Sequence, residues 1–466
     1  MKIKQIMTTM AVAVFALTAL NANAGNVDAN KARTIANQFI HQQNSKGLFN
    51  AHSADLVLVH TEASKAPSDA NAFYAFNLKG GGFVIIAGED RAPQVLGYSD
   101  TGYLDFNNLP YGLQGLLSGY KQEIEFLQNY KDDDLVPVHQ TLNAGSGVDP
   151  LIKTTWGQED PYDWQCPKKN GEYCVVGCVA TAMAQVMYYW KFPEGSAAIS
   201  GYTIGGGWWW GGSSLTVEAL PATTFDYSLM LKSYCHWDWN TSQLIQDTYT
   251  DAQAQEVAKL GRYCGQAVEM DYDPEGSGAY TSDQLAAMKS FGYRSTAQHV
   301  YKSGSQTSQW EAKMRTELDA GRPILYSADD TNGGGGHAFI CDGYNSDGMF
   351  HFNLGWYGTC DGWYVSTALN MTHRSGEYLK FNSGHEMLIG IQPPEGWVPP
   401  TYTIMGDVNM DGNVTIADVT ALIDYLLGGD DKAIDIEAAN VNGDSNVTIA
   451  DVTALIDMLL SGGANE

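Results

Sequence analysis

The sequence predicts an α+β protein built from three successive units, the last of them small and all-α. The chain has 466 residues, more than one hydrophobic core normally serves, and its 44% apolar and 11% aromatic residues suffice to build several cores. Helical and strand-like segments are mixed rather than regularly alternating, which is typical of α+β folds. Near the C-terminus, one loop-helix pattern occurs twice, which indicates a separate small module.

The chain is strongly acidic, with a formal net charge of -27 at pH 7. Such a charge argues against nucleic acid or an anionic membrane as a partner and favours solubility. Calcium sites also leave an acidic balance, because their ligands are carboxylate and amide oxygens.

Residues 1–24 have the pattern of a signal peptide. Lys2 and Lys4 precede an apolar run over residues 7–20, and Ala22 and Ala24 mark a small-residue cleavage site. This run is too short for a membrane span, and no later stretch approaches the ~18 consecutive apolar residues that a spanning helix needs. We therefore expect a protein that is secreted or attached to the cell surface, with no membrane span.

The first unit is expected over residues 25–145. Its pattern predicts helices at 29–41 and 113–130 and strands at 56–59, 73–78 and 82–87. No cluster of Cys, His and carboxylate residues lies inside it, so we expect a non-catalytic unit. The small residues at 141–148 are typical of a cleavable linker.

The middle unit is expected over residues 146–394 and contains a helix at 178–190, which Pro193 ends. Cys178 opens this helix, where the free N–H groups and the positive end of the helix dipole favour a thiolate, the nucleophilic form of cysteine. The alternative is a packed core cysteine, since free cysteine is among the most buried residue types.

A thiolate nucleophile needs a base, a group that orients the base, and donors for the oxyanion. His337 follows a run of four glycines at the start of a strand, Asn353 offers an amide with Trp356 nearby, and Gln158 offers a side-chain amide donor upstream. All four parts are therefore available on distant segments.

The chain has seven cysteines, an odd number for an exported protein. If Cys178 is free, the other six can form up to three disulfides, or several can be reduced and buried.

The segment 205–212 is rich in glycine and tryptophan. It is either a mobile loop beside a binding cleft or a segment whose aromatic rings fold onto the surface of the middle unit.

The third unit, at 403–463, follows a proline-rich linker at 395–402 and repeats one pattern with an offset of 33 residues. Each copy spaces oxygen ligands as a calcium-binding loop does, so we expect structural calcium. The second copy has Asn440 in place of an acid at its first position and Ser445 in place of glycine at its sixth, so it should bind more weakly. The expected ligands are Asp407, Asn409, Asp411, Asn413, Thr415 and Asp418 in the first copy, and Asn440, Asn442, Asp444, Asn446, Thr448 and Asp451 in the second.

This duplicated loop-helix resembles a dockerin, the module that in its family docks a secreted enzyme onto a cohesin partner. The order Gln158, Cys178, His337, Asn353 resembles the papain-like cysteine peptidases, and more closely the streptopain family. The motifs that carry this second resemblance lie at 177–185, 336–339 and 351–356.

The resemblance implies roles for five residues. Cys178 would be the nucleophile, His337 the general base and then acid, and Gln158 the oxyanion donor. Asn353 would orient the imidazole, and Trp356 would shield that hydrogen bond. This chain has Leu354 directly after Asn353, where the family commonly has Trp, so the residues expected to orient the imidazole depart from the family pattern.

The resemblance also implies a papain-like catalytic fold, an α+β inhibitory prodomain as the first unit, and no cofactor for catalysis. It predicts a secreted endopeptidase made as a zymogen, acting through a thioacyl-enzyme on peptides with an apolar side chain one residue before the scissile position. Two alternatives stay open: an inactive peptidase-like binding or adhesion protein, and a papain-like acyl transferase or amidase.

Overall fold

The fold is described from a computed structural model of the chain. The described residues are 25–45, 56–66, 70–130, 135–137, 147–205, 214–238, 241, 243–302, 307–329, 336–368, 371–373, 384–399, 405–410, 414–428, 434–444 and 446–460. The predicted signal peptide and most of the Trp-rich segment lie outside these residues, as do Asp411, Asn413 and Ser445.

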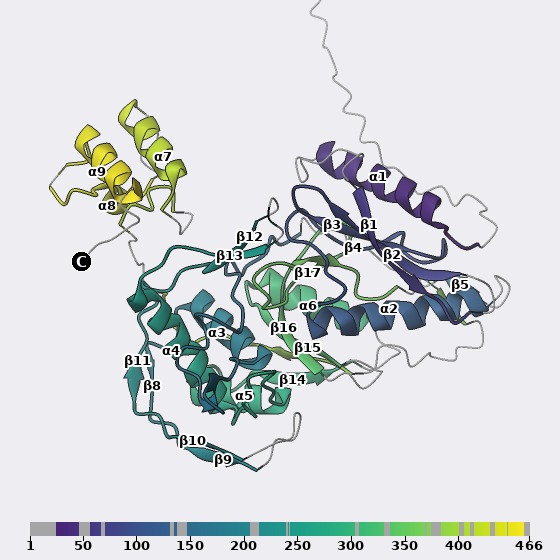
Figure 1. The fold of residues 1–466 in the computed structure, drawn as a ribbon, viewed down its shortest axis with the longest axis horizontal. Helices are drawn as coiled ribbons and strands as arrows, with labels where there is room; N and C mark the ends of the chain where they lie inside the picture. Colours follow the sequence, from purple (N-terminus) through teal and green to yellow (C-terminus); the bar gives the residue numbers. More distant parts are fainter. Residues whose placement is uncertain are drawn as a thin grey trace, which may run out of the picture.

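A ten-stranded antiparallel sheet forms the centre of the molecule, in the order β1-β2-β3-β4-β18-β17-β16-β15-β20-β14 (Figure 1). Its strands are β1 (Leu56–Ala63), β2 (Asn71–Leu78), β3 (Phe83–Ala87), β4 (Val95–Ser99), β14 (Gln298–Tyr301), β15 (Ile324–Asp329), β16 (Gly336–Tyr344), β17 (Phe350–Asn353), β18 (Gly362–Tyr364) and β20 (His385–Ile389).

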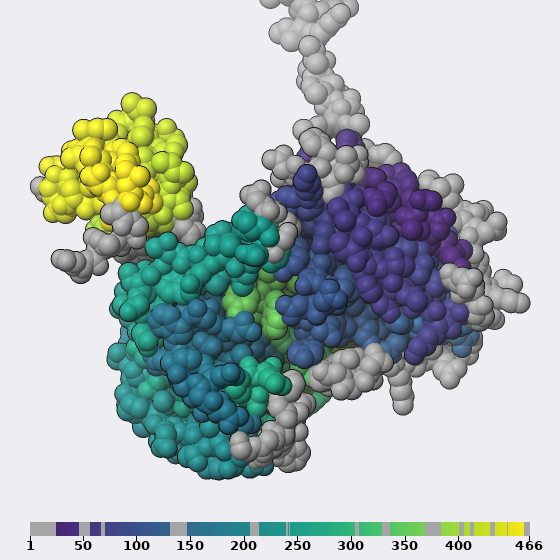
Figure 2. Space-filling view, in the orientation of Figure 1, coloured from purple at the N-terminus to yellow at the C-terminus, as the bar shows by residue number. Residues whose placement is uncertain are grey.

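The first unit and the middle unit share this sheet, which the sequence did not predict. Strand β4 pairs with β18, with Trp363 opposite Tyr98 and Tyr364 opposite Gly97. A Cβ atom at Gly97 would lie 2.4 Å from the Tyr364 ring, so only glycine fits at this junction. In Figure 2 the blue part of the surface of the first unit accordingly adjoins the teal and green surface of the middle unit.

Alternating residues of β16 place two helix layers on opposite faces of the sheet. Ala338 and Ile340 face the core that contains α3, α4 and α5, whereas Phe339 and Cys341 face the core that contains α2 and α6. The helices are α1 (Ala29–Ser45), α2 (Tyr111–Asn129), α3 (Cys178–Trp190), α4 (Asp251–Ala267), α5 (Thr281–Ser290), α6 (Thr307–Asp319), α7 (Ile416–Leu426), α8 (Ile436–Ala439) and α9 (Ile449–Leu460).

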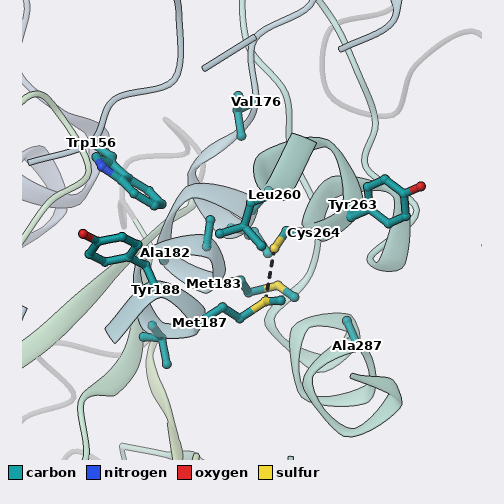
Figure 3. Packing of buried hydrophobic residues seen from close by; sticks show 14 of the residues in the cluster. Trp156, Val176, Ala182, Met183, Met187, Tyr188, Leu260, Tyr263, Cys264 and Ala287 are labelled. Atoms are coloured by element: carbon teal, nitrogen blue, oxygen red, sulfur yellow. Dashed lines mark hydrogen bonds between the residues drawn. The ribbon is translucent and has the colours of Figure 1, made fainter. Parts of the chain in front are cut away.

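The α3 helix is buried on nearly every side, as its mostly apolar sequence predicts. Met183 and Met187 pack against Leu260 and Cys264 of α4, with the Cys264 sulfur 3.4 Å from that of Met187 (Figure 3). This packing fixes the helix rigidly, so its N-terminal residue is held at a defined place.

Four short two-stranded ribbons lie in the described part of the middle unit. They are formed by β6 (Lys168–Lys169) with β7 (Glu172–Tyr173), β8 (Gly195–Ser196) with β11 (Thr223–Thr224), β9 (Tyr202–Ile204) with β10 (Leu215–Val217), and β12 (Cys235–Asp238) with β13 (Gln243–Gln246). A fifth ribbon joins the two units, because β5 (Leu135–Pro137) of the first unit pairs with β19 (Met371–His373) of the middle unit. All seven cysteines are free in the structure, and all except Cys178 are buried.

Helices α7, α8 and α9 form a small all-α lobe around its own core of Val408, Leu422 and Leu455 (Figure 1). The described part of the linker before this lobe contacts the middle unit through Trp397. The indole Nε1 of Trp397 donates a hydrogen bond to the Trp190 carbonyl at 3.1 Å, and its ring packs edge-on against Phe192. None of the helices in the described ranges combines the length and apolar character needed to cross a bilayer.

Candidate active site

Cys178 lies at the N-terminus of α3, as the sequence predicts. The preceding residue, Gly177, has a φ of 86°, and a Cβ atom there would lie 2.8 Å from the Met270 side chain and 2.9 Å from the Ser277 carbonyl. Both the backbone conformation and the close contacts therefore require glycine. The sharp entry into the helix leaves the Cys178 thiol half-buried at the edge of a cavity.

His337 is the second residue of β16, and its imidazole interacts with the Cys178 thiol. Burial raises the pKa of Cys178, but the charge and hydrogen bond of His337 and the N–H groups of Ala338 and Val179 together bring that pKa below its ordinary value. The Ala338 N–H lies 3.4 Å from the sulfur. Burial in turn lowers the pKa of His337, but the thiolate and the Leu354 carbonyl raise it above its ordinary value. The two shifts favour a thiolate-imidazolium pair.

The group that holds the imidazole is the backbone carbonyl of Leu354, which corrects the role expected for Asn353. The Nε2 atom of His337 lies 3.1 Å from the Leu354 oxygen, which leaves the other ring nitrogen for the thiol. A carbonyl oxygen accepts only, so it keeps the Nε2 proton in place as an amide oxygen would. The hydrogen bond that Trp356 was expected to shield, between Asn353 and His337, is therefore not made.

Asn353 instead ties the site to α3. Its Oδ1 accepts hydrogen bonds from Gln185 Nε2 at 3.0 Å and from the Gly355 N–H at 3.2 Å, and its Nδ2 donates to the Thr154 carbonyl at 2.7 Å. The Thr154 hydroxyl donates in turn to Gln185 Oε1 at 2.7 Å. This buried network fixes the segment that leads to Gln158 relative to the helix that carries Cys178.

Gln158, Trp356 and Cys178 line one cavity of about 410 Å³ together with His337. The Val176 N–H donates to the Gln158 carbonyl at 2.9 Å, so the backbone of Gln158 is tied to the segment just before Cys178. Gln158 therefore lines the same cavity as the nucleophile, and the donation of its side-chain amide to an oxyanion stays a prediction. The cavity lining includes three glutamates, Glu159, Glu275 and Glu386, and no lysine or arginine among the residues that the structure describes.

The first unit reaches this cavity through the N-terminal end of α2. Tyr111 lines the cavity, and a Cβ atom at Gly112 would lie 2.8 Å from both the His337 ring and the Phe339 ring. The helix therefore approaches the imidazole as closely as its glycine permits. Tyr111, Gly112 and the carbonyl of Leu354 could not be recognised as parts of the site from the sequence, because neither a close backbone approach nor a carbonyl acceptor has a sequence signature.

None of the described ligands of the predicted calcium loops lines this cavity. In each loop, the carboxylate of the last expected ligand accepts hydrogen bonds from backbone N–H groups. Asp418 accepts from the Asn409 N–H at 3.1 Å and the Thr415 N–H at 2.7 Å. Asp451 accepts from the Asn442 N–H at 3.1 Å and the Thr448 N–H at 2.8 Å in the second loop.

The residues present in the second loop fit a calcium ion. Among the described residues, the Oδ1 atom of Asn440, at the first loop position, is buried without a hydrogen-bond partner, which is the environment expected for an oxygen that binds a cation. Within the described residues, no group of three or more His, Cys, Asp or Glu side chains converges as a metal site. Amide and hydroxyl oxygens, the other ligands expected here, do not enter such a group.

Comparison with known protein families assigns each unit. A model of the peptidase C10 family matches residues 156–364, a Spi protease inhibitor model matches residues 24–124, and a dockerin type I domain model matches residues 405–460.

Three relatives are similar over most of the chain. The thiol protease/hemagglutinin PrtT of Porphyromonas gingivalis is 27% identical over 428 residues, which cover 86% of this chain and 46% of the relative. Streptopain of Streptococcus pyogenes is 28% identical over 346 residues, covering 69% of this chain and 80% of streptopain. A solved structure of a prointerpain A fragment from Prevotella intermedia superposes with a TM-score of 0.55 at 29% identity, covering 72% of this chain and 100% of the fragment.

The present chain thus spans about half the length of the PrtT relative. The papain-like α+β fold with an N-terminal prodomain and a C-terminal dockerin, predicted from the sequence, is confirmed. Residues 156–364 thus form a peptidase C10 domain, the domain of the streptopain family of thiol peptidases.

Proposed function

We propose that this chain is a secreted cysteine endopeptidase made as an inactive precursor and attached to a partner through its dockerin. The observation that carries the proposal is the pairing of Cys178 with His337 at the mouth of a cavity that also contains Gln158. A thiolate, a proton donor and an oxyanion donor at one place are what acyl transfer needs.

The proposed reaction proceeds through a thioester. The Cys178 thiolate attacks the peptide carbonyl, and the Gln158 amide with the Cys178 N–H stabilises the oxyanion. His337 donates its proton to the leaving amine as the C–N bond breaks, then takes a proton from the water that hydrolyses the thioester. Leu354 keeps the imidazole in place throughout through its carbonyl.

The proposed precursor comprises a signal peptide at 1–24, an inhibitory prodomain at 25–145, a catalytic unit at 146–394, a linker at 395–402 and a dockerin at 403–463. Tyr111 in the cavity and Gly112 against His337 support inhibition by the prodomain, because a substrate would have to displace α2. The Trp363 and Tyr364 backbone pairing with β4 adds a second point of attachment.

The proposed dockerin binds calcium and docks onto a cohesin-type partner at the cell surface or on a secreted complex. The two copies expose apolar side chains at equivalent positions: Ile416 at the start of α7 and Leu427 directly after it, and Ile449 and Leu460 at the two ends of α9. An exposed apolar surface on so small a lobe favours a protein partner.

The deciding experiment is incubation of the purified full chain with casein under reducing conditions, with sequencing of any new N-terminus. Wild type should degrade casein and lose the residues up to about 145. Cys178→Ala should remain unprocessed, with activity lower by at least ~10³-fold, because the nucleophile is gone. Cys235→Ala removes a buried cysteine outside the cavity lining and is the matched control, which should process normally.

Retained activity in Cys178→Ala would refute the proposal. The binding-protein alternative predicts no labelling of wild-type Cys178 by an epoxide inhibitor of thiol peptidases. The acyl transferase alternative predicts that an added amine, rather than water, receives the acyl group from a peptide substrate.

A further inference from the structure

The loop between β17 and β18, residues 354–361, carries three features of the site. It begins with Leu354, whose carbonyl accepts from His337, and it places Trp356 and Tyr357 in the lining of the cavity. Three of its residues have left-handed backbone conformations, with φ of 64° at Gly355, 58° at Tyr357 and 73° at Gly358. Such a path is unfavourable for the non-glycine residue Tyr357, so something must hold the loop closed.

The carboxylate of Asp361 joins the two ends of this loop. Its Oδ1 accepts a hydrogen bond of 2.7 Å from the Leu354 N–H, and so joins the last residue of the loop to the first. Asp361 is only 9% exposed, and the bond to its carboxylate is buried. Hydrogen bonds to a carboxylate are stronger than those between neutral groups, and more so away from water.

Leu354 is therefore held at both of its backbone polar groups, by Asp361 at the N–H and by His337 at the carbonyl. Its side chain is fully buried in the core that contains α2 and α6, so the residue cannot swing about its Cα atom. We infer that Asp361 is a positioning residue for His337, acting through the backbone of Leu354. This inference rests on the proposed peptidase function.

Several groups surround Asp361. His351 lies on β17 and binds Asp342 Oδ1 through Nδ1 at 2.7 Å, and Asp100 lies close enough to affect the His351 ring. Burial raises the pKa of Asp361 to about 7, while the Leu354 N–H and His351 oppose that rise and Asp342 adds to it. Whether the carboxyl is charged or neutral, an oxygen remains that can accept from Leu354.

Asp342 provides a matched control. It is also a buried carboxylate on the central sheet, and its Oδ2 also accepts a hydrogen bond from a backbone N–H, that of Ile152 at 2.9 Å. It contacts His351 but makes no hydrogen bond to Leu354. Loss of Asp342 removes the same kind of interaction but leaves Leu354, whose carbonyl accepts from His337, held by Asp361.

The test compares Asp361→Ala, Asp361→Asn and Asp342→Ala with wild type in two measurements. One is kcat/KM of the processed enzyme on a peptide. The other is the rate at which iodoacetamide alkylates Cys178 in the full chain as a function of pH, located by mass spectrometry. The second does not require activity, so an inactive wild type would sink the proposed function while still testing Asp361.

We expect Asp361→Ala to lower kcat/KM at least about tenfold, because a misplaced imidazole transfers its proton poorly. The midpoint of Cys178 alkylation should move up by about one pH unit, because a loosened His337 stabilises the thiolate less. Asp361→Asn should regain most of both values, since its amide oxygen can accept the same hydrogen bond. Asp342→Ala should lower the melting temperature and leave the alkylation profile unchanged.

Three results would overturn the inference: an unchanged Asp361→Ala profile, the same profile shift in Asp342→Ala, or no recovery in Asp361→Asn. If Asp361→Ala does not fold, Asp361→Ser takes its place with the same expectations. The serine side chain is too short to accept the hydrogen bond from the Leu354 N–H.

Discussion

Cys178 and His337 stabilise each other's charged forms, and this coupling determines the pH dependence of the site. The pKa of Cys178 lies below its ordinary 9.0 and that of His337 above its ordinary 6.5. Below the thiol pKa the sulfur is protonated, and above the imidazole pKa the proton donor is lost. The reactive pair therefore exists where the sulfur has lost its proton and the imidazole still holds one.

We accordingly predict a bell-shaped dependence of kcat/KM on pH, rising through the thiol pKa and falling through the imidazole pKa. Alkylation of Cys178 should already be fast below pH 9, because its thiol pKa is lowered. In His337→Ala the rise of the alkylation rate with pH should move to higher pH. Burial raises the thiol pKa, and the imidazole no longer opposes that effect. A wild-type alkylation profile centred near pH 9 would contradict the thiolate-imidazolium pair.

The other six cysteines provide an internal control for this measurement. Burial raises the pKa of each of their thiols, so they should stay unlabelled at acid and neutral pH. They are Cys166, Cys174, Cys235, Cys264, Cys341 and Cys360.

Gln158 permits a second prediction at the scale of one residue. Replacement by alanine removes the proposed side-chain donor to the oxyanion and should lower kcat by ~10² to 10³, the usual effect of losing one such donor. The Cys178 alkylation profile should not change, because Gln158 is not among the groups that shift the thiol pKa. Full activity in Gln158→Ala would assign the oxyanion to other donors.

At the scale of elements, α2 is held to the catalytic unit by a buried charge. Glu123 is 2% exposed, and its carboxylate accepts from the Thr367 hydroxyl at 2.8 Å and from the Ala368 N–H. Both donors belong to the middle unit, so the carboxylate links the first unit to the middle unit.

We predict that Glu123→Ala weakens this attachment by about 2 to 3 kcal/mol, because it leaves buried donors without an acceptor. The precursor should then be processed faster, and Cys178 in it should be alkylated faster. Glu125→Ala is the matched control on the same helix, since its carboxylate binds only the Lys65 N–H of the first unit among the bonds described. Equal processing rates in the two variants would show that Glu123 does not hold the prodomain.

At the scale of the whole molecule, the dockerin lobe and the catalytic cavity should respond separately to calcium. Removal of calcium by a chelator should lower the melting temperature of the C-terminal lobe and leave peptide hydrolysis unchanged, because the expected ligands are far from the cavity in sequence and none lines it.

Calorimetric titration of the full chain should find two sites, the second weaker on the order of tenfold because it lacks an acidic first ligand. Asp451→Ala should abolish the weaker site, and Asp424→Ala, which changes an exposed carboxylate outside the expected ligands, should change neither. No calcium uptake by wild type would refute the calcium assignment.

Local sequence determined the elements that carry the chemistry. The helix predicted at 178–190 is α3, because its apolar spacing and the proline after it act within one segment. The predicted strand that follows the glycine run is β16, with His337 near its start. The repeated loop-helix of the dockerin is likewise visible in the sequence, since each copy is self-contained.

The tertiary structure alone decided how these elements meet. Asn353 has the side chain expected to orient a histidine, yet it binds Gln185 and Thr154, and the Leu354 carbonyl takes that place. Every residue has such a carbonyl, so its role depends on where the chain turns. The pairing of β4 with β18 and the approach of α2 to His337 are also contacts between distant segments. The sequence thus determined which groups are available, whereas long-range packing determined which of them come within hydrogen-bond distance.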